Sequence, residues 1–179
     1  YYQNHLTCKK QNVPIIQKKG RRFYATFSYE ENVSLIPEES ISKICAVDLG
    51  LGTDATCCIM DQEGTVYARK FISFSEEHDR LHTQLGRIKR NQKRGSRHNK
   101  TLWRKVSGIS QDIADKTVKA ILDFGNDHGV DVFVLEYLDF KGKNAVKRAH
   151  FWSYKRIYKV LAQRAHQYGL RIARVNARY

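Results

Sequence analysis

Apolar residues in this chain follow two different spacings, and the spacing changes several times along the sequence. Short apolar runs bounded by turn residues predict five strands, at residues 44–48, 55–61, 66–72, 132–136 and 171–175. Apolar residues three and four apart predict three helices, starting at Ser75 and covering about 102–124 and 154–168. Ser75 is the expected N-cap of the first helix. Residues 91–100 are a polar break between the first two helices, and 141–150 are a predicted loop.

The lengths of the connections predict how the strands pair. Short turns join the first three strands, so these form an antiparallel meander. A strand that follows a helix normally pairs in parallel through a right-handed crossover. The fourth strand then lies beside the first, on the side that the meander leaves free. The predicted fold class is α/β, with a mixed sheet of order 3-2-1-4-5 flanked by helices.

The first forty residues differ from the rest. Apolar runs at 13–16 and 22–29 flank a Lys-Lys-Gly turn and predict a β-hairpin. Alternating apolar residues along 23–29 predict that one face of this hairpin is half-buried. Residues 30–42 contain several acids and Pro37, which predicts a linker and a domain boundary near residue 41.

One carboxylate stands at the tip of each of two predicted strands. Asp48 ends the first strand and precedes two glycines, and Glu136 ends the fourth. These strands are predicted to be parallel neighbours where the chain order reverses, which is where ligands tend to bind. Two close carboxylates repel each other, and a divalent cation removes that cost. Because Mg²⁺ prefers oxygen ligands, the pair predicts a magnesium site formed by Asp48 and Glu136.

Asp48 by itself also has a structural interpretation. Asp48 could form an Asx turn that stabilises the glycine loop after it. We interpret Asp54, Asp61 and Asp139 as solvated turn acids rather than as a third ligand. Only the pairing of Asp48 with Glu136 favours a metal site.

The charge of the chain predicts a polyanionic partner. Its 179 residues include 32 lysines and arginines but only 18 acids, a formal net charge of +14. Nucleic acid is the favoured partner. A membrane is not, because no apolar run approaches the roughly 20 residues of a spanning helix. The chain does not begin with methionine and lacks a signal-peptide pattern, so we expect a piece of a longer cytoplasmic protein.

Two groups of cations are candidates for nucleic-acid contact. The first surrounds the break between the first two helices, has Trp103 and His98 among it, and consists of Arg87, Lys89, Arg90, Lys93, Arg94, Arg97, Lys100, Arg104 and Lys105. The second follows Glu136 and consists of Lys141, Lys143, Lys147 and Arg148. An ordinary solvated surface is the alternative for the first group.

The four cysteines do not predict a metal site. Cys8, Cys45, Cys57 and Cys58 form no C-x-x-C pair, so we expect no zinc within this segment. Buried, reduced thiols are the favoured interpretation.

Several of these segments together resemble one nuclease family. Residues 46–51, AVDLGL, resemble the first RuvC motif of the transposon-encoded TnpB nucleases and the related type V CRISPR effectors. Residues 134–138, VLEYL, resemble their second motif, and 140–142, FKG, match what often follows it. The basic segment 93–97 and the aromatic pair 151–152 are also similar. The resemblance covers roughly residues 15–179.

This resemblance implies an RNase H-like (RuvC) fold and RNA-guided DNA cleavage, with guide RNA and target DNA as partners. It implies two Mg²⁺ ions, with Mn²⁺ as an alternative, and a prokaryotic, phage or mobile-element origin. Residues 1–40 would be the last β part of an oligonucleotide-binding (wedge) domain plus a linker, and 41–179 an incomplete RuvC domain. Tyr137 stands where the family often has a second acid or an amide. A third acidic motif and a zinc ribbon would follow Tyr179, so we expect the isolated segment to cleave poorly or not at all.

Two other functions stay open at this stage. One is a non-cleaving nucleic-acid-binding module from a decayed transposase. The other is an actin-like kinase or ATPase, whose phosphate loop also begins Asp-x-Gly. The basic charge and the lack of a second Asp-x-Gly motif argue against the latter. The sequence predicts neither the guide RNA, nor the target motif, nor the oligomeric state.

Overall fold

The computed structural model describes residues 10–30, 32–50, 52–96, 98–137 and 145–176, and gives the backbone alone for 10, 11, 29 and 145–153. The chain divides into two compact units, Tyr1–Ser34 and Leu35–Tyr179. None of the helices described is long and apolar enough to cross a membrane.

The first unit is a two-stranded ribbon. Strands β2 (Ile15–Lys19) and β3 (Arg22–Thr26) pair antiparallel around a turn at Gly20, whose φ of 63° suits glycine. Farther from this turn, β1 (Lys10–Gln11) pairs with β4 (Tyr29–Glu30). The predicted hairpin is confirmed. The predicted half-buried face is wrong: among the described residues no second layer covers this ribbon, both strands are exposed along their whole length, and Phe23 is 71% exposed.

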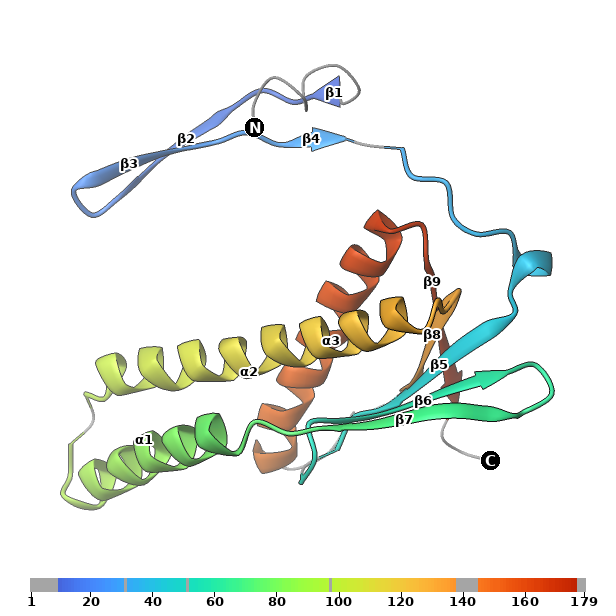
Figure 1. Ribbon diagram of the computed structural model, residues 1–179. Helices are drawn as coiled ribbons and strands as arrows, with labels where there is room; N and C mark the ends of the chain where they lie inside the picture. Colours follow the sequence, from blue (N-terminus) through green and yellow to red (C-terminus); the bar gives the residue numbers. More distant parts are fainter. Residues whose placement is uncertain (1–9, 31, 51, 97, 138–144, 177–179) are drawn as a thin grey trace. The chain divides into compact units, whose positions relative to one another are not determined.

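The second unit is built on a five-stranded mixed sheet. After a short 3-10 helix, η2 (Glu38–Ser40), its strands are β5 (Lys43–Asp48), β6 (Ala55–Asp61), β7 (Val66–Ile72), β8 (Val132–Tyr137) and β9 (Arg171–Asn176). Their order across the sheet is β7-β6-β5-β8-β9, which confirms the predicted 3-2-1-4-5 (Figure 1). β5 pairs antiparallel with β6 and parallel with β8, and β8 pairs parallel with β9.

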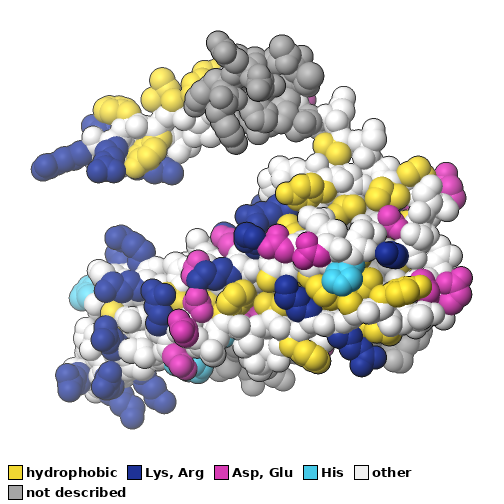
Figure 2. Space-filling model, in the orientation of Figure 1, with side chains coloured by type: hydrophobic (Ala, Val, Ile, Leu, Met, Phe, Trp, Pro, Cys, Tyr) yellow, Lys and Arg dark blue, Asp and Glu magenta, His cyan; other side chains and the backbone are white. Residues whose placement is uncertain are grey.

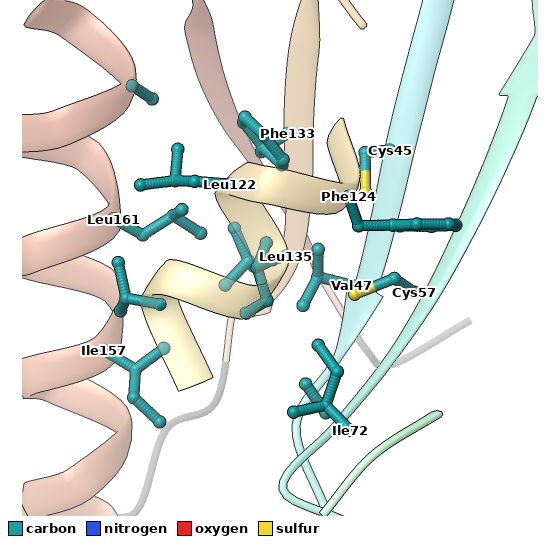
Figure 3. Close-up of a cluster of buried hydrophobic side chains, with 14 of the residues drawn as sticks. Cys45, Val47, Cys57, Ile72, Leu122, Phe124, Phe133, Leu135, Ile157 and Leu161 are labelled. Carbon is teal, nitrogen blue, oxygen red and sulfur yellow. The ribbon is translucent and has the colours of Figure 1, made fainter. Parts of the chain in front are cut away.

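Three helices complete this unit, namely α1 (Ser75–Lys93), α2 (Lys100–Asp127) and α3 (Ala145–Gln167). Both crossovers advance in the same direction across the sheet, so the right-handed rule places α2 and α3 on one face. The core lies between them and the sheet: Figure 3 shows Leu122 and Leu161 gathered around Phe133 and Leu135. The first half of α2 packs beside α1 and extends past the sheet (Figure 1).

Three local expectations were wrong. Ser75 is the first residue of α1 rather than its cap, and the cap position belongs to Phe74, which has no capping side chain of its own. Helix α2 runs to Asp127, past its predicted end near residue 124; Gly125 is buried within its last turn, and the chain leaves the helix through Gly129, where φ is 62°. Helix α3 begins at Ala145, inside the predicted loop, because a helix can extend through basic residues that lack an apolar pattern.

The start of the second unit is tied to the amino ends of its strands. Oδ2 of Asp131 accepts hydrogen bonds from the backbone N–H groups of Ser42 (2.8 Å) and Lys43 (2.9 Å). Ile36, within the predicted linker, donates its N–H to the Gly169 carbonyl, and its own carbonyl accepts from Arg171. Residues 36–43 therefore lie against β8 and β9. Cys45 and Cys57 are buried free thiols, as predicted.

Candidate metal centre and nucleic-acid interface

The two predicted metal ligands occupy equivalent places on neighbouring strands. The last pair in the parallel β5–β8 register is Val47 with Leu135. Asp48 and Glu136 each come one residue later and are still part of their strands. They therefore stand side by side at the carboxyl ends of β5 and β8, which we call the carboxylate edge.

Alternation along the strands explains why these acids are exposed. Val47 and Leu135 point into the core beneath α2 and α3 and are almost fully buried. Successive side chains point to opposite faces, so Asp48 and Glu136 turn away from that core. Both are exposed, which spares the cost of burying two carboxylates.

A tyrosine of α3 is within the electrostatic influence of both acids. Burial raises the pKa of the Tyr154 phenol, and the negative charges of Asp48 and Glu136 raise this pKa further. Tyr154 lies one turn before Ile157, on the helix face that packs against the core. The electrostatic influence of both carboxylates on one hydroxyl supports their placement at a common edge.

The carboxylate edge supplies part of a metal-binding set. Two exposed carboxylates fit Mg²⁺, which commonly takes one or two carboxylates and completes its shell with water and phosphate oxygens. Within the described ranges, no three His, Cys, Asp or Glu side chains gather in a way that could hold an ion. Asp48 and Glu136 would therefore hold the metal together with oxygens from water and from the nucleic acid.

Of the three acids interpreted as solvated turn residues, one fits and one does not. Asp61 lies in the β6–β7 turn, where it accepts hydrogen bonds from the Thr65 N–H and the Tyr67 hydroxyl, and the bond from Tyr67 lowers its pKa. For Asp54 the interpretation was wrong, because its side chain is only 9% exposed. Asp139 lies outside the described residues.

Asp54 belongs to a polar contact that the sequence did not reveal. Its Oδ1 lies 2.7 Å from Nε2 of His78, and its Oδ2 accepts the N–H of Phe74 at 2.8 Å. Asp54 and His78 are 24 positions apart and belong to no spacing pattern, so no local signal pairs them. Only the β6–β7 pairing brings the two segments together.

The first group of predicted cations forms a basic surface at the far end of the α1–α2 hairpin. We call this surface the basic hairpin, and its described members are Arg87, Lys89, Arg90, Lys93, Arg94, Lys100, Arg104 and Lys105. All eight are exposed, and Figure 2 shows Lys and Arg side chains gathered there without acids among them. No ion pair between described residues involves them, so their charge is available to a polyanion. Trp103, which is 49% exposed, adds a ring on which a base could stack.

Neutral side chains order the turn of this hairpin. Asn99 is buried, and its Oδ1 accepts from Nδ2 of Asn91 across the turn at 3.0 Å. The Ser96 N–H also bonds to the Asn91 carbonyl. Hydrogen bonds between described residues therefore connect the two helices that carry most of these cations.

The remaining predicted cations are not placed. Arg97, Lys141 and Lys143 lie outside the described residues. Lys147 and Arg148 belong to the first turn of α3, for which the backbone alone is described. Their contact with nucleic acid stays a prediction.

The structure is similar to parts of larger proteins. A Cas12f1–sgRNA–target DNA complex matches with a TM-score of 0.58 and 17% identity, over 91% of this chain and 41% of that chain. A CRISPR-Cas12f ternary complex matches with a TM-score of 0.59 and 19% identity, over 93% of this chain and 35% of that one. C2c1 of Alicyclobacillus acidoterrestris, in complex with single-guide RNA, matches with a TM-score of 0.53 and 11% identity, over 77% of this chain and 33% of that chain.

By sequence, no family model and no curated protein matches this chain. The structural matches are below 20% identity, so they establish a shared fold and nothing further. This chain also spans less than half the length of each protein. Together with the strand order, they confirm the predicted RNase H-like (RuvC) α/β fold, which this chain shares with parts of the Cas12f1, CRISPR-Cas12f and C2c1 structures.

Proposed function

We propose that this chain is the nuclease part of an RNA-guided DNA endonuclease, in which Asp48 and Glu136 bind divalent metal. The observation that carries the proposal is the β5–β8 register, which places one exposed carboxylate at the end of each of two parallel strands. Structural acids are usually satisfied by neighbouring donors, as Asp131 is at the opposite end of the same strands. Two adjacent exposed acids at a switch point of the sheet fit a ligand site better than a structural role.

The proposed chemistry is hydrolysis of a phosphodiester. Two Mg²⁺ ions, or Mn²⁺ in their place, would supply positive charge to both the attacking and the leaving oxygen. Asp48 and Glu136 would orient these charges toward the scissile phosphate. The basic hairpin would hold the backbone of the same nucleic acid by neutralising phosphates.

Guide RNA and target DNA are the proposed partners. Proteins with this fold are described as complexes with sgRNA and target DNA, and this chain carries a net charge of +14. Residues 1–40 would be the last β part of an oligonucleotide-binding (wedge) domain plus a linker, and the wedge part would contact the guide. We infer a prokaryotic or mobile-element origin from the same similarity.

The test replaces each acid by its amide in the intact protein. Asp48→Asn and Glu136→Gln should each lower Mg²⁺-dependent cleavage on the order of 10³-fold or more, because a neutral amide binds the metal weakly. DNA binding measured without metal should stay within about twofold, since these acids are not the groups that hold phosphate. Glu63→Gln, an exposed acid in the β6–β7 turn, is the control and should cleave normally. Retained cleavage in either amide variant would refute the assignment.

The alternative is a module that binds nucleic acid without cutting it. The exposed cations of the basic hairpin would serve both functions equally well. If the intact protein binds DNA and RNA but cuts neither with Mg²⁺ nor with Mn²⁺, the binding module is the correct interpretation.

A further inference from the structure

The contact between Asp54 and His78 lies at the same edge of the sheet as the two candidate ligands. Asp48 pairs with Thr56 across the β5–β6 ladder, and Asp54 is two residues before Thr56. Ala55 pairs with Ile72 of β7, and His78 follows in the first turn of α1. The contact thus joins the start of β6 to the start of α1, two strands away from Glu136.

The described residues between Asp48 and Asp54 lie close to one another. At Gly50 a Cβ atom would lie 2.8 Å from the Thr53 carbonyl oxygen, so the backbone folds closely on itself there. Leu49 is buried and fixes the beginning of the loop. Its other end is fixed by the side chain of Asp54, which accepts from Phe74 N–H and from His78 Nε2.

The first turn of α1 is itself held in place. Lys116 of α2 bridges Glu77 of α1 and Asp112, and the bond from Lys116 lowers the pKa of Glu77. His78 therefore projects from a helix end that α2 supports. Asp54 connects the loop after Asp48 to this supported end.

We propose that Asp54 and His78 are positioning residues, which set the place of the Asp48 carboxylate by anchoring the far end of its loop. This inference rests on the proposed metal-binding function of Asp48. Small displacements of a reacting group cost large factors in rate, so loss of the anchor weakens the site while the sheet stays folded.

A purely structural role is the competing explanation. An acid near a helix N-terminus stabilises the helix by accepting a free N–H and by opposing the helix dipole. In that case Asp54 would contribute to stability alone. The two explanations differ in what they predict for metal binding.

A matched control is available at the opposite end of the same strands. Asp131 also accepts two backbone N–H groups, those of Ser42 and Lys43, but at the amino edge of β5 and β8. The experiment compares Asp54→Asn with Asp131→Asn in the intact protein. It measures Mn²⁺ affinity by electron paramagnetic resonance, cleavage rate constants and the thermal midpoint.

We expect the two variants to lose similar amounts of stability and to differ at the metal site. Asp54→Asn should raise the Kd for Mn²⁺ about tenfold and lower kcat about tenfold, with KM for DNA unchanged within about twofold. Asp131→Asn should leave Mn²⁺ affinity and kcat within about twofold of the wild type. Equal Mn²⁺ affinity in the two variants would overturn the proposal.

Substitutions of His78 provide a second measurement if Asp54→Asn does not fold. His78→Phe removes the donor while Asp54 keeps its bond to Phe74, and should weaken Mn²⁺ binding like Asp54→Asn. His78→Gln places an amide nitrogen about where Nε2 stands and should restore most of the affinity. If His78→Phe binds Mn²⁺ as the wild type does, the positioning role is refuted.

Asp48→Asn separates this inference from the function on which it rests. If Asp48→Asn weakens Mn²⁺ binding and Asp54→Asn does not, the anchor is refuted and the metal site stands. If Asp48→Asn binds Mn²⁺ as the wild type does, the proposed function is refuted, and the positioning role with it.

Discussion

The carboxylate edge and the basic hairpin carry the two kinds of charge that the proposed nuclease needs, and they are built in different ways. Asp48 and Glu136 owe their place to a strand register, and each follows a buried residue, Val47 or Leu135. The cations of the basic hairpin lie exposed on helix surfaces around an ordered turn. The first arrangement depends on a few residues in one geometry, whereas the second depends on the number of charges.

This difference predicts how each region responds to change. A substitution that displaces α2 or the strands should disturb both acids of the carboxylate edge, because α2, β5 and β8 share one hydrophobic core (Figure 3). Removing a cation from the basic hairpin should cost one phosphate contact and leave the other contacts intact. The four predictions below test this contrast, beginning with the largest effect.

Gly125→Ala should be the most disruptive of the four changes. A Cβ at this position would lie 2.4 Å from Cζ of Phe133 and 2.9 Å from Cγ2 of Val130. Phe133 is fully buried and has no room to move away. We expect the free energy of unfolding to fall by about 1–3 kcal/mol, measured by urea denaturation. A variant as stable as the wild type would mean that α2 and β8 are not packed as closely as they lie here.

Removing two cations from the basic hairpin should change the salt dependence of nucleic-acid binding. Lys93 and Arg94 are both exposed at the turn. For duplex DNA, log K falls as log salt rises, and each phosphate contact makes this slope steeper by about 0.9. The double variant Lys93→Ala, Arg94→Ala should therefore make the slope shallower by up to about 1.8, measured by fluorescence anisotropy at several salt concentrations.

The control removes two cations elsewhere in the second unit. Lys119 lies on α2 in an ion pair with Asp123, and Lys159 is exposed on α3. Replacing both by alanine lowers the net charge by the same amount. If this control reduces the slope as much as the hairpin variant does, binding follows overall charge, and the basic hairpin is not a distinct interface.

The contrast between the two regions also explains what the sequence could predict. The strand order and the Asp48–Glu136 pair followed from apolar runs, short turns and the crossover rule, which all depend on local patterns. The exposure of the basic hairpin followed from its composition. The Asp54–His78 contact could not be predicted, because it depends on how two turns meet in space.

Helix boundaries show the same limit at Gly125. A glycine near the end of an apolar pattern is typical of a helix end, and the apolar spacing predicts that this helix ends near residue 124. In the structure this glycine instead lets α2 approach the ring of Phe133. Glycine is needed at this position because of its contact with Phe133, and Phe133 belongs to a strand that begins several residues later.

Asp131 should make a pH-dependent contribution to the free energy of unfolding that is smaller than the effect of Gly125→Ala. Burial raises its pKa, but the N–H groups of Lys43 and Ser42, the Ser42 hydroxyl and the Lys43 charge together bring it below the ordinary 3.8. A lowered pKa in the folded state means that the contribution is complete above the ordinary pKa and is lost as the pH falls through the lowered one. Because the carboxylate is partly exposed and solvent screens its charge, Asp131→Ala should cost at most about 1 kcal/mol at pH 7.

The measurement for this prediction is urea denaturation of both proteins over a range of pH. The difference between wild type and Asp131→Ala should be constant from neutral pH down to the ordinary pKa and should shrink below it. A difference that is independent of pH would mean that the carboxylate charge contributes nothing at the amino edge. The carboxylate edge should keep its Mn²⁺ affinity in this variant.

Gly108→Ala should have the smallest effect, and its sign should be opposite to that of Gly125→Ala. Gly108 lies in the same helix, is exposed, and a Cβ there would meet no atom within 4 Å. Alanine loses less backbone entropy in a helix than glycine, so the free energy of unfolding should rise by about 0.5–1 kcal/mol. Nucleic-acid binding should not weaken, since no charge changes. If Gly108→Ala destabilises the protein instead, this part of α2 is as tightly packed as the part behind the carboxylate edge, and the contrast between the two regions fails.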